Sequence, residues 1–451
     1  VQRLAANVGR PAKVAGELER DGHLRLTGAT LNSSTLALSS NNLAALIENE
    51  SLSEISGDLA YRGDLRLLQN WLSDPASPSA WKTGGSLNGT LNILRNGPTT
   101  EVIWASHIEN LVAHQTGGDL LHQQHVQCDG ECQFNTTADR LSIRNMLLRC
   151  DAMTCNASGT IDHLAEQRDM KLQGEVDYDL AKVATLLRPY IGENVQLVGK
   201  QRKNFTLDGP LNAPAEATPG TLESSLVGRL QGETSVGWDS GNLYGFQLGT
   251  GSLDGKLSGG RLKVSALDVP LSGGRLNANP LFVLAPGTAE MYLDSGPLLT
   301  RVNLTPEMCR ETLMFIAPVF ADVAQAQGNF SIDLNGGRVP LATPSEGDLA
   351  GQFTIHNVEI AGGPLVRELG VLLQRPSTAS LAHESKVAFR MVGGRIYHRD
   401  LELVFPELTI RTHGSVGLDH SLALMAEMPV PPKWLGNNTL GNAMRNQIIQ
   451  L

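Results

Sequence analysis

The sequence predicts a mainly β protein, an elongated and curved antiparallel sheet that forms repeated β-groove modules with a few short amphipathic helices. Three observations lead to this fold class. Apolar and polar residues alternate in many short runs, as strands with one buried face require. Glycine is frequent, with 47 residues, whereas aromatic residues make up only 5% of the chain, which suits many turns and short strands. One strand-and-helix pattern occurs twice, at 57–68 and 174–183, and such repeats favour a sheet that grows by stacking.

The strands are predicted from the alternation of apolar and polar residues. Period-two alternation is strict over residues 87–93, 205–208 and 330–335, so each segment has one apolar and one polar face. The alternation changes phase within 262–271 and 401–410. Such phase changes predict bulges or turns that bend the sheet.

Helices are few. Asp64 and Asp179 each precede an amphipathic segment as N-caps, and Thr305 followed by Pro306 is a third helix start. A fourth helix is expected from Pro364 and a fifth over about 438–448. We expect their apolar faces to cover part of the sheet.

A Pro-, Ala- and Gly-rich linker at 209–220 suggests a division of the chain. The predicted regions are 1–212, with the two strand-and-helix repeats, and 213–451, with the C-terminal β-groove.

Composition limits the function. The net charge of −10 and the pI near 5.6 argue against nucleic acid as a partner. No segment approaches 18 consecutive apolar residues, so no transmembrane helix is expected within this sequence. The sequence begins at Val1 without Met or a signal peptide, and we interpret it as a piece of a longer protein.

Four of the five cysteines, Cys128, Cys132, Cys150 and Cys155, fall within 28 residues. A disulfide pair on neighbouring strands is the favoured interpretation, in an oxidising compartment. A four-thiolate zinc site and free buried thiols are the alternatives, although neither pair has the usual CxxC spacing of zinc knuckles. Cys309 is expected in the core.

Motifs of catalysis are absent from the sequence: GxSxG, HExxH and the phosphate-binding loop do not occur. His122 and His125 near Cys128 are interpreted as a polar loop leading into a strand, and Asp400 and Glu402 as a turn and a polar strand face. The sequence therefore predicts no catalytic residue, no metal, no cofactor and no enzymatic activity.

Gly-punctuated strand runs at 248–257, 271–278, 389–396, 400–403 and 413–419 resemble the AsmA-like family of bacterial envelope proteins, relatives of TamB and of the bridge-like lipid-transfer proteins. The resemblance is clearest over 220–451. It implies a curved sheet with an apolar inner groove in the periplasm, which moves phospholipid towards the outer membrane. It also implies an inner-membrane anchor, which would lie outside this sequence, and outer-membrane or envelope proteins as further partners.

A physical argument leads to a similar expectation. About five short helices cannot cover the apolar faces of so many strands, so the sheet either curls onto itself or leaves apolar surface for a ligand. The residues predicted to line a lipid groove are Leu87, Leu91, Ile93, Leu262, Val264, Phe330, Ile332, Leu334, Phe353, Ile355, Leu401 and Leu403. The alternative for each residue is an ordinary sandwich core. A structural or adhesive β-repeat protein without lipid is the main alternative function, and a carbohydrate-active β-helix enzyme is a third.

Overall fold

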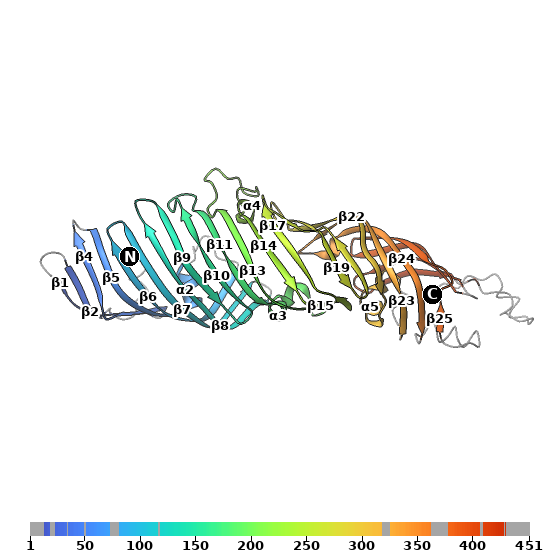
Figure 1. Cartoon of the computed structure of the whole chain (residues 1–451), viewed down its shortest axis with the longest axis horizontal. Coiled ribbons are helices and arrows are strands. Elements are labelled where there is room, and N and C mark those ends of the chain that lie inside the picture. Colours follow the sequence, from blue (N-terminus) through green and yellow to red (C-terminus); the bar gives the residue numbers. More distant parts are fainter. Residues whose placement is uncertain are drawn as a thin grey trace, which may run out of the picture. The chain divides into compact units, whose positions relative to one another are not determined.

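The computed structural model describes residues 13–18, 23–33, 35–48, 51–72, 81–115, 118–317, 325–361, 378–405, 409–427 and 429. In this part of the chain the strands belong to one open antiparallel sheet, and the helices are few and short (Figure 1). The predicted fold class, mainly β with an antiparallel sheet, is confirmed.

The chain forms two compact units. Unit 1 comprises Val1–Glu193, Gly199–Thr218 and Arg229–Ser235, and unit 2 comprises Asn194–Val198, Pro219–Gly228 and Val236–Leu451. The predicted division after residue 212 falls within Gly199–Thr218, a segment that packs with unit 1.

The elements of unit 1 are β1 (Lys13–Leu18), β2 (His23–Asn32), β3 (Leu36–Ser40), β4 (Leu43–Glu48), β5 (Ser51–Asp64), α2 (Leu65–Leu72), β6 (Trp81–Asn96), β7 (Thr99–Gln115), β8 (Gly118–Asn135), β9 (Arg140–Arg149), β10 (Met153–Asp162), β11 (Asp169–Asp179), α3 (Leu180–Ile191), β13 (Lys200–Pro210) and most of β14 (Gln231–Trp238).

The elements of unit 2 are β12 (Val195–Val198), α4 (Leu226–Arg229), β15 (Ser240–Leu243), β16 (Phe246–Leu248), β17 (Gly251–Ser258), β18 (Arg261–Val264), β19 (Leu267–Leu271), β20 (Gly274–Ala278), β21 (Leu281–Val283), β22 (Glu290–Asn303), α5 (Pro306–Glu311), η1 (Leu313–Phe315), β23 (Gln325–Pro340), η3 (Pro344–Glu346), β24 (Asp348–Ala361), β25 (Thr378–Ser380), β26 (Ser385–Val392), β27 (Arg395–Val404), β28 (Thr409–Gly417) and β29 (Leu422–Glu427).

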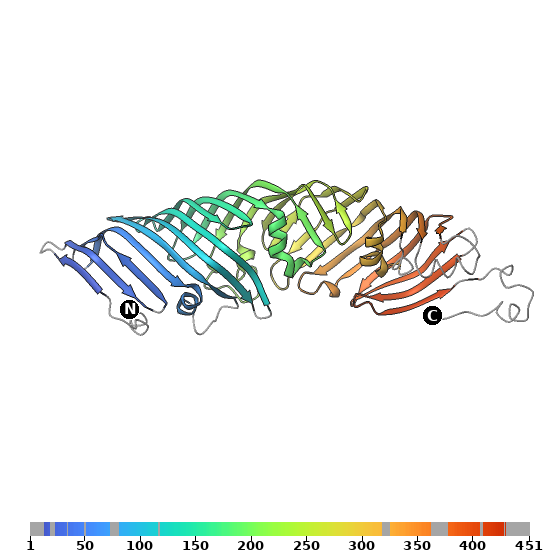
Figure 2. The same ribbon diagram turned by 90° about the horizontal axis from the view of Figure 1, so that it is seen from below.

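Unit 1 is a meander of long strands. From β5 to β11 each strand pairs with the next in the sequence, and β11 then pairs with β13. β8 has 18 residues, which corresponds to about 60 Å of extended chain. Register shifts interrupt several pairs, for example between Gly84 and Ser86 of β6. Figure 2 shows these strands side by side in one curved layer.

The two helices of unit 1 begin where the repeated pattern predicts. The Asp64 carboxylate accepts hydrogen bonds from the backbone N–H groups of Arg66 (2.9 Å) and Leu67 (3.3 Å), and Asp179 accepts one from Ala181 (3.2 Å). An even number of antiparallel pairings separates β5 from β11, so these strands run in the same direction. Consequently α2 and α3 lie at the same end of the sheet.

Unit 2 contains strands that are broken in the middle. The phase change predicted within 262–271 is the break between β18 and β19. The one predicted within 401–410 spans the end of β27 and the start of β28, which pair as antiparallel neighbours. β18 pairs with β21 while β19 pairs with β20, so the two halves form separate ladders. Both predicted phase changes therefore coincide with the ends of strands.

Unit 2 fills its own interior. Phe246 on β16 and Phe330 on β23 have ring centroids 6.3 Å apart, although β19, β20 and β22 lie between their strands in the sheet. A flat sheet would separate those strands by about 19 Å. The sheet of unit 2 therefore curls back on itself, and α5 adds the fully buried Met308 and Cys309.

The start of α5 is as predicted, because the Thr305 hydroxyl accepts the N–H of Met308 at 3.2 Å and Pro306 is the first helical residue. The helices expected from Pro364 and over 438–448 lie outside the described residues.

Candidate functional site

The largest uncovered feature of unit 1 is one face of its sheet. Alternate residues of each strand lie on this face and pair in rows across the sheet. One row contains Leu59, Leu91, Trp104, Gly130 and Met146. We call this surface the apolar face of unit 1. Its apolar members are Ile55, Leu59, Tyr61, Leu87, Leu91, Ile93, Val102, Trp104, Ile108, Val126, Cys128, Cys132, Phe134, Leu141, Ile143, Met146, Leu148, Cys155, Ala157, Ile161, Met170, Leu172, Val176, Phe205 and Leu207.

Most of this face is only half-buried. The predicted lining residues Leu87, Leu91 and Ile93 all have intermediate exposure, and Leu148 is 39% exposed. Neighbouring side chains within a sheet cover the flanks of a residue, whereas a second layer covers its tip. Half-burial along contiguous rows therefore indicates that no second layer of described residues covers them.

The helices cover one end of the apolar face. The Gln69 side chain of α2 accepts the backbone N–H of Thr83 on β6 at 2.7 Å, and Leu68 contacts Gly63 on β5. α3 packs against β8 and β11 and buries Leu180. The apolar rows beyond these helices have no helix over them in the described part of unit 1.

Aromatic rings lie flat on this face over glycines of the neighbouring strands. A Cβ atom placed on Gly89 would overlap the Tyr61 ring, one on Gly130 would overlap Trp104, and one on Gly174 would meet Phe205. Each glycine is paired with its aromatic residue across adjacent strands. The rings of Tyr61, Trp104 and Phe205 therefore lie along the sheet and do not project from it. They give the apolar face a smooth surface, which we call the floor of unit 1. The sequence pattern alone did not identify this feature.

In unit 2 the predicted groove residues are covered. Phe330, Phe353, Ile355, Leu401 and Leu403 have no exposed surface, and Val264, Ile332 and Leu334 are at most 7% exposed. Leu262 is half-buried. In this structure the eight buried residues form a core, the alternative left open above, because the sheet of unit 2 curls over its own apolar face. The open part of the predicted groove thus lies in unit 1.

The disulfide prediction is not met, since all five cysteines are free thiols. Cys128 and Cys155 both pair with Leu148, which lies between them on β9, and Cys132 pairs with Ile143. A disulfide needs cysteines at adjacent positions with Cα atoms about 4.4–6.8 Å apart. The register thus keeps Cys128, Cys132 and Cys155 apart from one another.

Burial raises the pKa of several of these thiols. It raises the pKa of Cys132, with a further contribution from the Glu131 charge, and it raises the pKa of Cys155. Burial raises the pKa of Cys309 to about 11. Since the thiolate is the nucleophile and the metal ligand, these sites favour neither role.

His122 and His125 lie within β8, not in a loop, and pair with Val112 and Glu109 of β7. A hollow of about 470 Å³ on the polar side of the sheet includes His125, His107, Glu109 and Arg149 in its lining. Among the described residues, no three His, Cys, Asp or Glu side chains are arranged to hold a metal ion.

In the described part of unit 2, Ser331, His356 and Glu384 form a relay of polar groups that resembles a catalytic triad. The Ser331 hydroxyl lies 2.8 Å from Nε2 of His356, whose Nδ1 lies 2.6 Å from Glu384. The Ser331 oxygen also accepts the N–H of Arg301 at 3.0 Å, beside a register shift in β22. Through these contacts the Ser331 side chain joins β22, β23 and β24.

Asp400 and Glu402 also have structural positions: Asp400 has a positive φ of 56° in β27, and Glu402 accepts two hydrogen bonds from Arg411.

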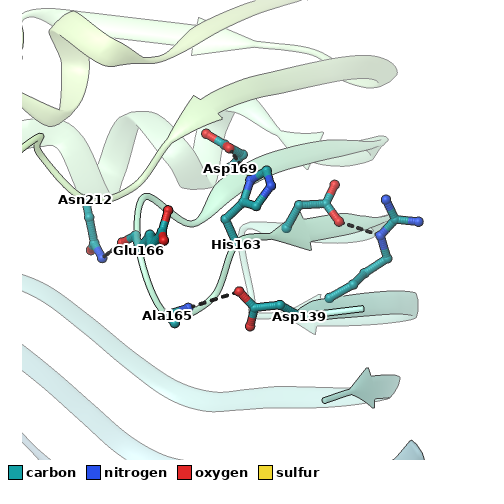
Figure 3. A network of polar contacts seen from close by, with 8 residues as sticks. Asp139, His163, Ala165, Glu166, Asp169 and Asn212 are labelled. Atoms are coloured by element: carbon teal, nitrogen blue, oxygen red, sulfur yellow. Dashed lines mark hydrogen bonds and ion pairs between the residues drawn. The ribbon is translucent and has the colours of Figure 1, made fainter. Parts of the chain in front are cut away.

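A second polar cluster joins turns at the end of unit 1 opposite the helices (Figure 3). The Asp139 carboxylate accepts the N–H of Ala165 at 3.4 Å, and the Asn212 amide donates to the carbonyl of Glu166 at 2.7 Å. His163 Nδ1 lies 2.7 Å from Asp169, which raises the pKa of His163. These contacts connect three successive turns, and we interpret them as holding the ends of the strands together.

The fold and the candidate site define a class of protein: an open antiparallel sheet with one apolar face that no second layer covers in the part of the chain that the structure describes. No protein-family model matches the chain, and no curated protein matches it. None of the helices in the described residues is long and apolar enough to cross a membrane.

Proposed function

We propose that this protein transports phospholipid without catalysis, with the hydrocarbon chains held against the apolar face of unit 1. The single observation that carries the proposal is the half-buried state of contiguous apolar rows across β5–β11 and β13. Large exposed apolar surfaces on soluble proteins mark sites of interaction with ligands, membranes or proteins. The resemblance to AsmA-like proteins supports a periplasmic setting, an inner-membrane anchor outside this sequence and a role in outer-membrane biogenesis.

The driving force is adequate. Burial of a methylene group contributes about 0.8 kcal/mol, so a chain with fourteen methylenes gains roughly 11 kcal/mol when fully covered and roughly half of that against one surface. Apolar contact is non-directional, and the floor is smooth where rings lie over glycines. A chain can therefore slide along the face without crossing high barriers.

Site-specific photo-crosslinking tests this proposal. A photoreactive residue at Leu91 lies on the apolar face, whereas one at Asn92, the next residue, lies on the exposed polar face. After purification without detergent, mass spectrometry is expected to find phospholipid attached at position 91 and not at 92. Absence of lipid at 91, together with lipid-free native mass spectra, would reject transport in favour of a structural or adhesive role.

A charge substitution provides the functional control. Leu91→Asp places a carboxylate on the apolar face, and Thr90→Asp places the same group at an exposed position of the polar face, where its cross-strand neighbours are Ala60 and Ala105. Lipid capture from vesicles is expected to fall in the first variant and to stay unchanged in the second.

A further inference from the structure

The apolar face of unit 1 has an unequal charge distribution. The protein carries a net charge of −10, yet the positions of β5–β11 and β13 that share this face include no Asp or Glu among the described residues. The charged residues at these positions are both cations, Arg95 on β6 and Lys203 on β13. Acidic side chains of the same strands lie on the opposite face.

Lys203 is placed on the apolar face by its register. It pairs with Val176 of β11, and Phe205, two residues further along β13, lies over Gly174 on the same face. Lys203 is half-buried, whereas its neighbours Arg202 and Asn204 are exposed.

Adjacent residues of β13 therefore present one cation to each side, with different surroundings. On the polar side, Arg202 Nε donates to Asp177 at 2.9 Å, and the guanidinium lies 3.7 Å from Glu175. On the apolar side, Lys203 makes no ion pair with any described residue. A cation beside Val176 and Phe205 interacts with an anion more strongly than it would in water, because the surroundings are less polar.

Arg95 is the weaker candidate of the two. Its Nε already donates to the Gly97 carbonyl at 3.3 Å, near the turn between β6 and β7. It lies six strand spacings from Lys203, about 29 Å along the sheet, so the two cations cannot hold one headgroup.

We infer that Lys203 binds the phosphate of an anionic phospholipid whose acyl chains lie over the Phe205 side of the apolar face. This inference rests on the proposed function and adds a substrate class to it. A lysine ammonium is a common partner of phosphate. A zwitterionic headgroup brings its own cation close to Lys203, which offsets the attraction, so lipids with a net negative headgroup are preferred.

The test uses the full chain and vesicles that contain equal amounts of phosphatidylglycerol and phosphatidylcholine. Captured lipid is extracted and the ratio of the two is measured for the wild type, Lys203→Gln, Lys203→Arg and the control Lys171→Gln. Lys171 is an exposed cation of β11 that pairs with Asp208 on the opposite face.

The wild type is expected to favour phosphatidylglycerol about five- to tenfold, as one charge-assisted contact allows. Lys203→Gln should bring the ratio close to one with total lipid little changed, while Lys203→Arg and Lys171→Gln keep the preference. An unchanged ratio in Lys203→Gln would overturn the inference and leave lipid transport standing. Failure of every protein, including the wild type, to capture either lipid would overturn the proposed function itself.

Discussion

Phe330, Phe353 and Leu401 in unit 2 have no exposed surface, whereas Leu91 and Ile93 in unit 1 remain half-exposed. All five occupy the apolar positions of alternating strands. The difference in burial therefore arises from tertiary packing and not from the pattern of the individual strands. Broken strands and α5 allow unit 2 to close over its own apolar face. In the described part of unit 1, by contrast, the long strands are covered by two helices at one end. The same pattern thus yields a core in one unit and a surface in the other.

The largest expected effect tests the core of unit 2. Phe353→Ala removes a fully buried ring that packs 5.4 Å from Phe330, and it should lower the free energy of unfolding of unit 2 by about 3–5 kcal/mol. Hydrogen exchange in the presence of denaturant resolves the two units. Phe134→Ala is the same change at a half-buried position of unit 1, and it should lower the free energy of unfolding of unit 1 by clearly less. Equal costs would contradict the distinction between the units.

A smaller effect tests the floor of unit 1. Gly130→Ala forces the Trp104 ring off its glycine, and overpacking of this kind costs about 1–3 kcal/mol. Exchange protection in β7 and β8 should fall and the tryptophan emission should shift. Gly84→Ala is the control, because a Cβ there meets nothing within 4 Å. If both variants behave like the wild type, the ring does not rest on Gly130.

Through His398 and His163, acid is expected to change the stability of the two units in opposite directions. Burial lowers the pKa of His398, whose Nδ1 has no hydrogen-bond partner among the described residues, and the charge of His413 lowers it further. As pH falls below about 6.5, the unfolded chain binds a proton at His398 that folded unit 2 does not bind. The free energy of unfolding of unit 2 therefore decreases by at most about 1.4 kcal/mol per pH unit. His163 of unit 1 has a raised pKa through Asp169, so its contribution is present in acid and is lost as pH rises.

Unfolding curves between pH 5 and 8 test this contrast. In the wild type, His398 Nε2 lies 3.1 Å from the Thr412 hydroxyl. In His398→Gln the amide can retain this contact but does not titrate, so the loss of stability of unit 2 in acid should be smaller. A variant with the same acid sensitivity as the wild type would assign that sensitivity to other groups.

The smallest effect concerns the open face itself. Leu91→Ala should change the free energy of unfolding by about 1 kcal/mol or less, because the side chain is only half removed from water. Lipid capture should nevertheless decrease. A loss above about 3 kcal/mol would mean that Leu91 belongs to a closed core, and the proposed role of unit 1 would then lose its basis.

Local structure was largely predictable from the residues. Asp64 and Asp179 cap helices because a short carboxylate reaches the first free N–H groups, whatever the rest of the fold does. Strand alternation at 87–93 and 330–335 likewise follows from local pattern. The disulfide prediction failed because four nearby cysteines in sequence say nothing about register, and register places Leu148 between Cys128 and Cys155.

By itself, the sequence determined the β class, the helix starts and which side of each strand is apolar, since these depend on residues a few positions apart. Only the tertiary structure decided which apolar side is covered. Covering depends on curvature summed over many strands, as the contact between Phe246 and Phe330 demonstrates, and on where α2, α3 and α5 pack. Period-two alternation is identical for a core and for an open floor, because a side chain's neighbours within the sheet do not reveal what lies above it.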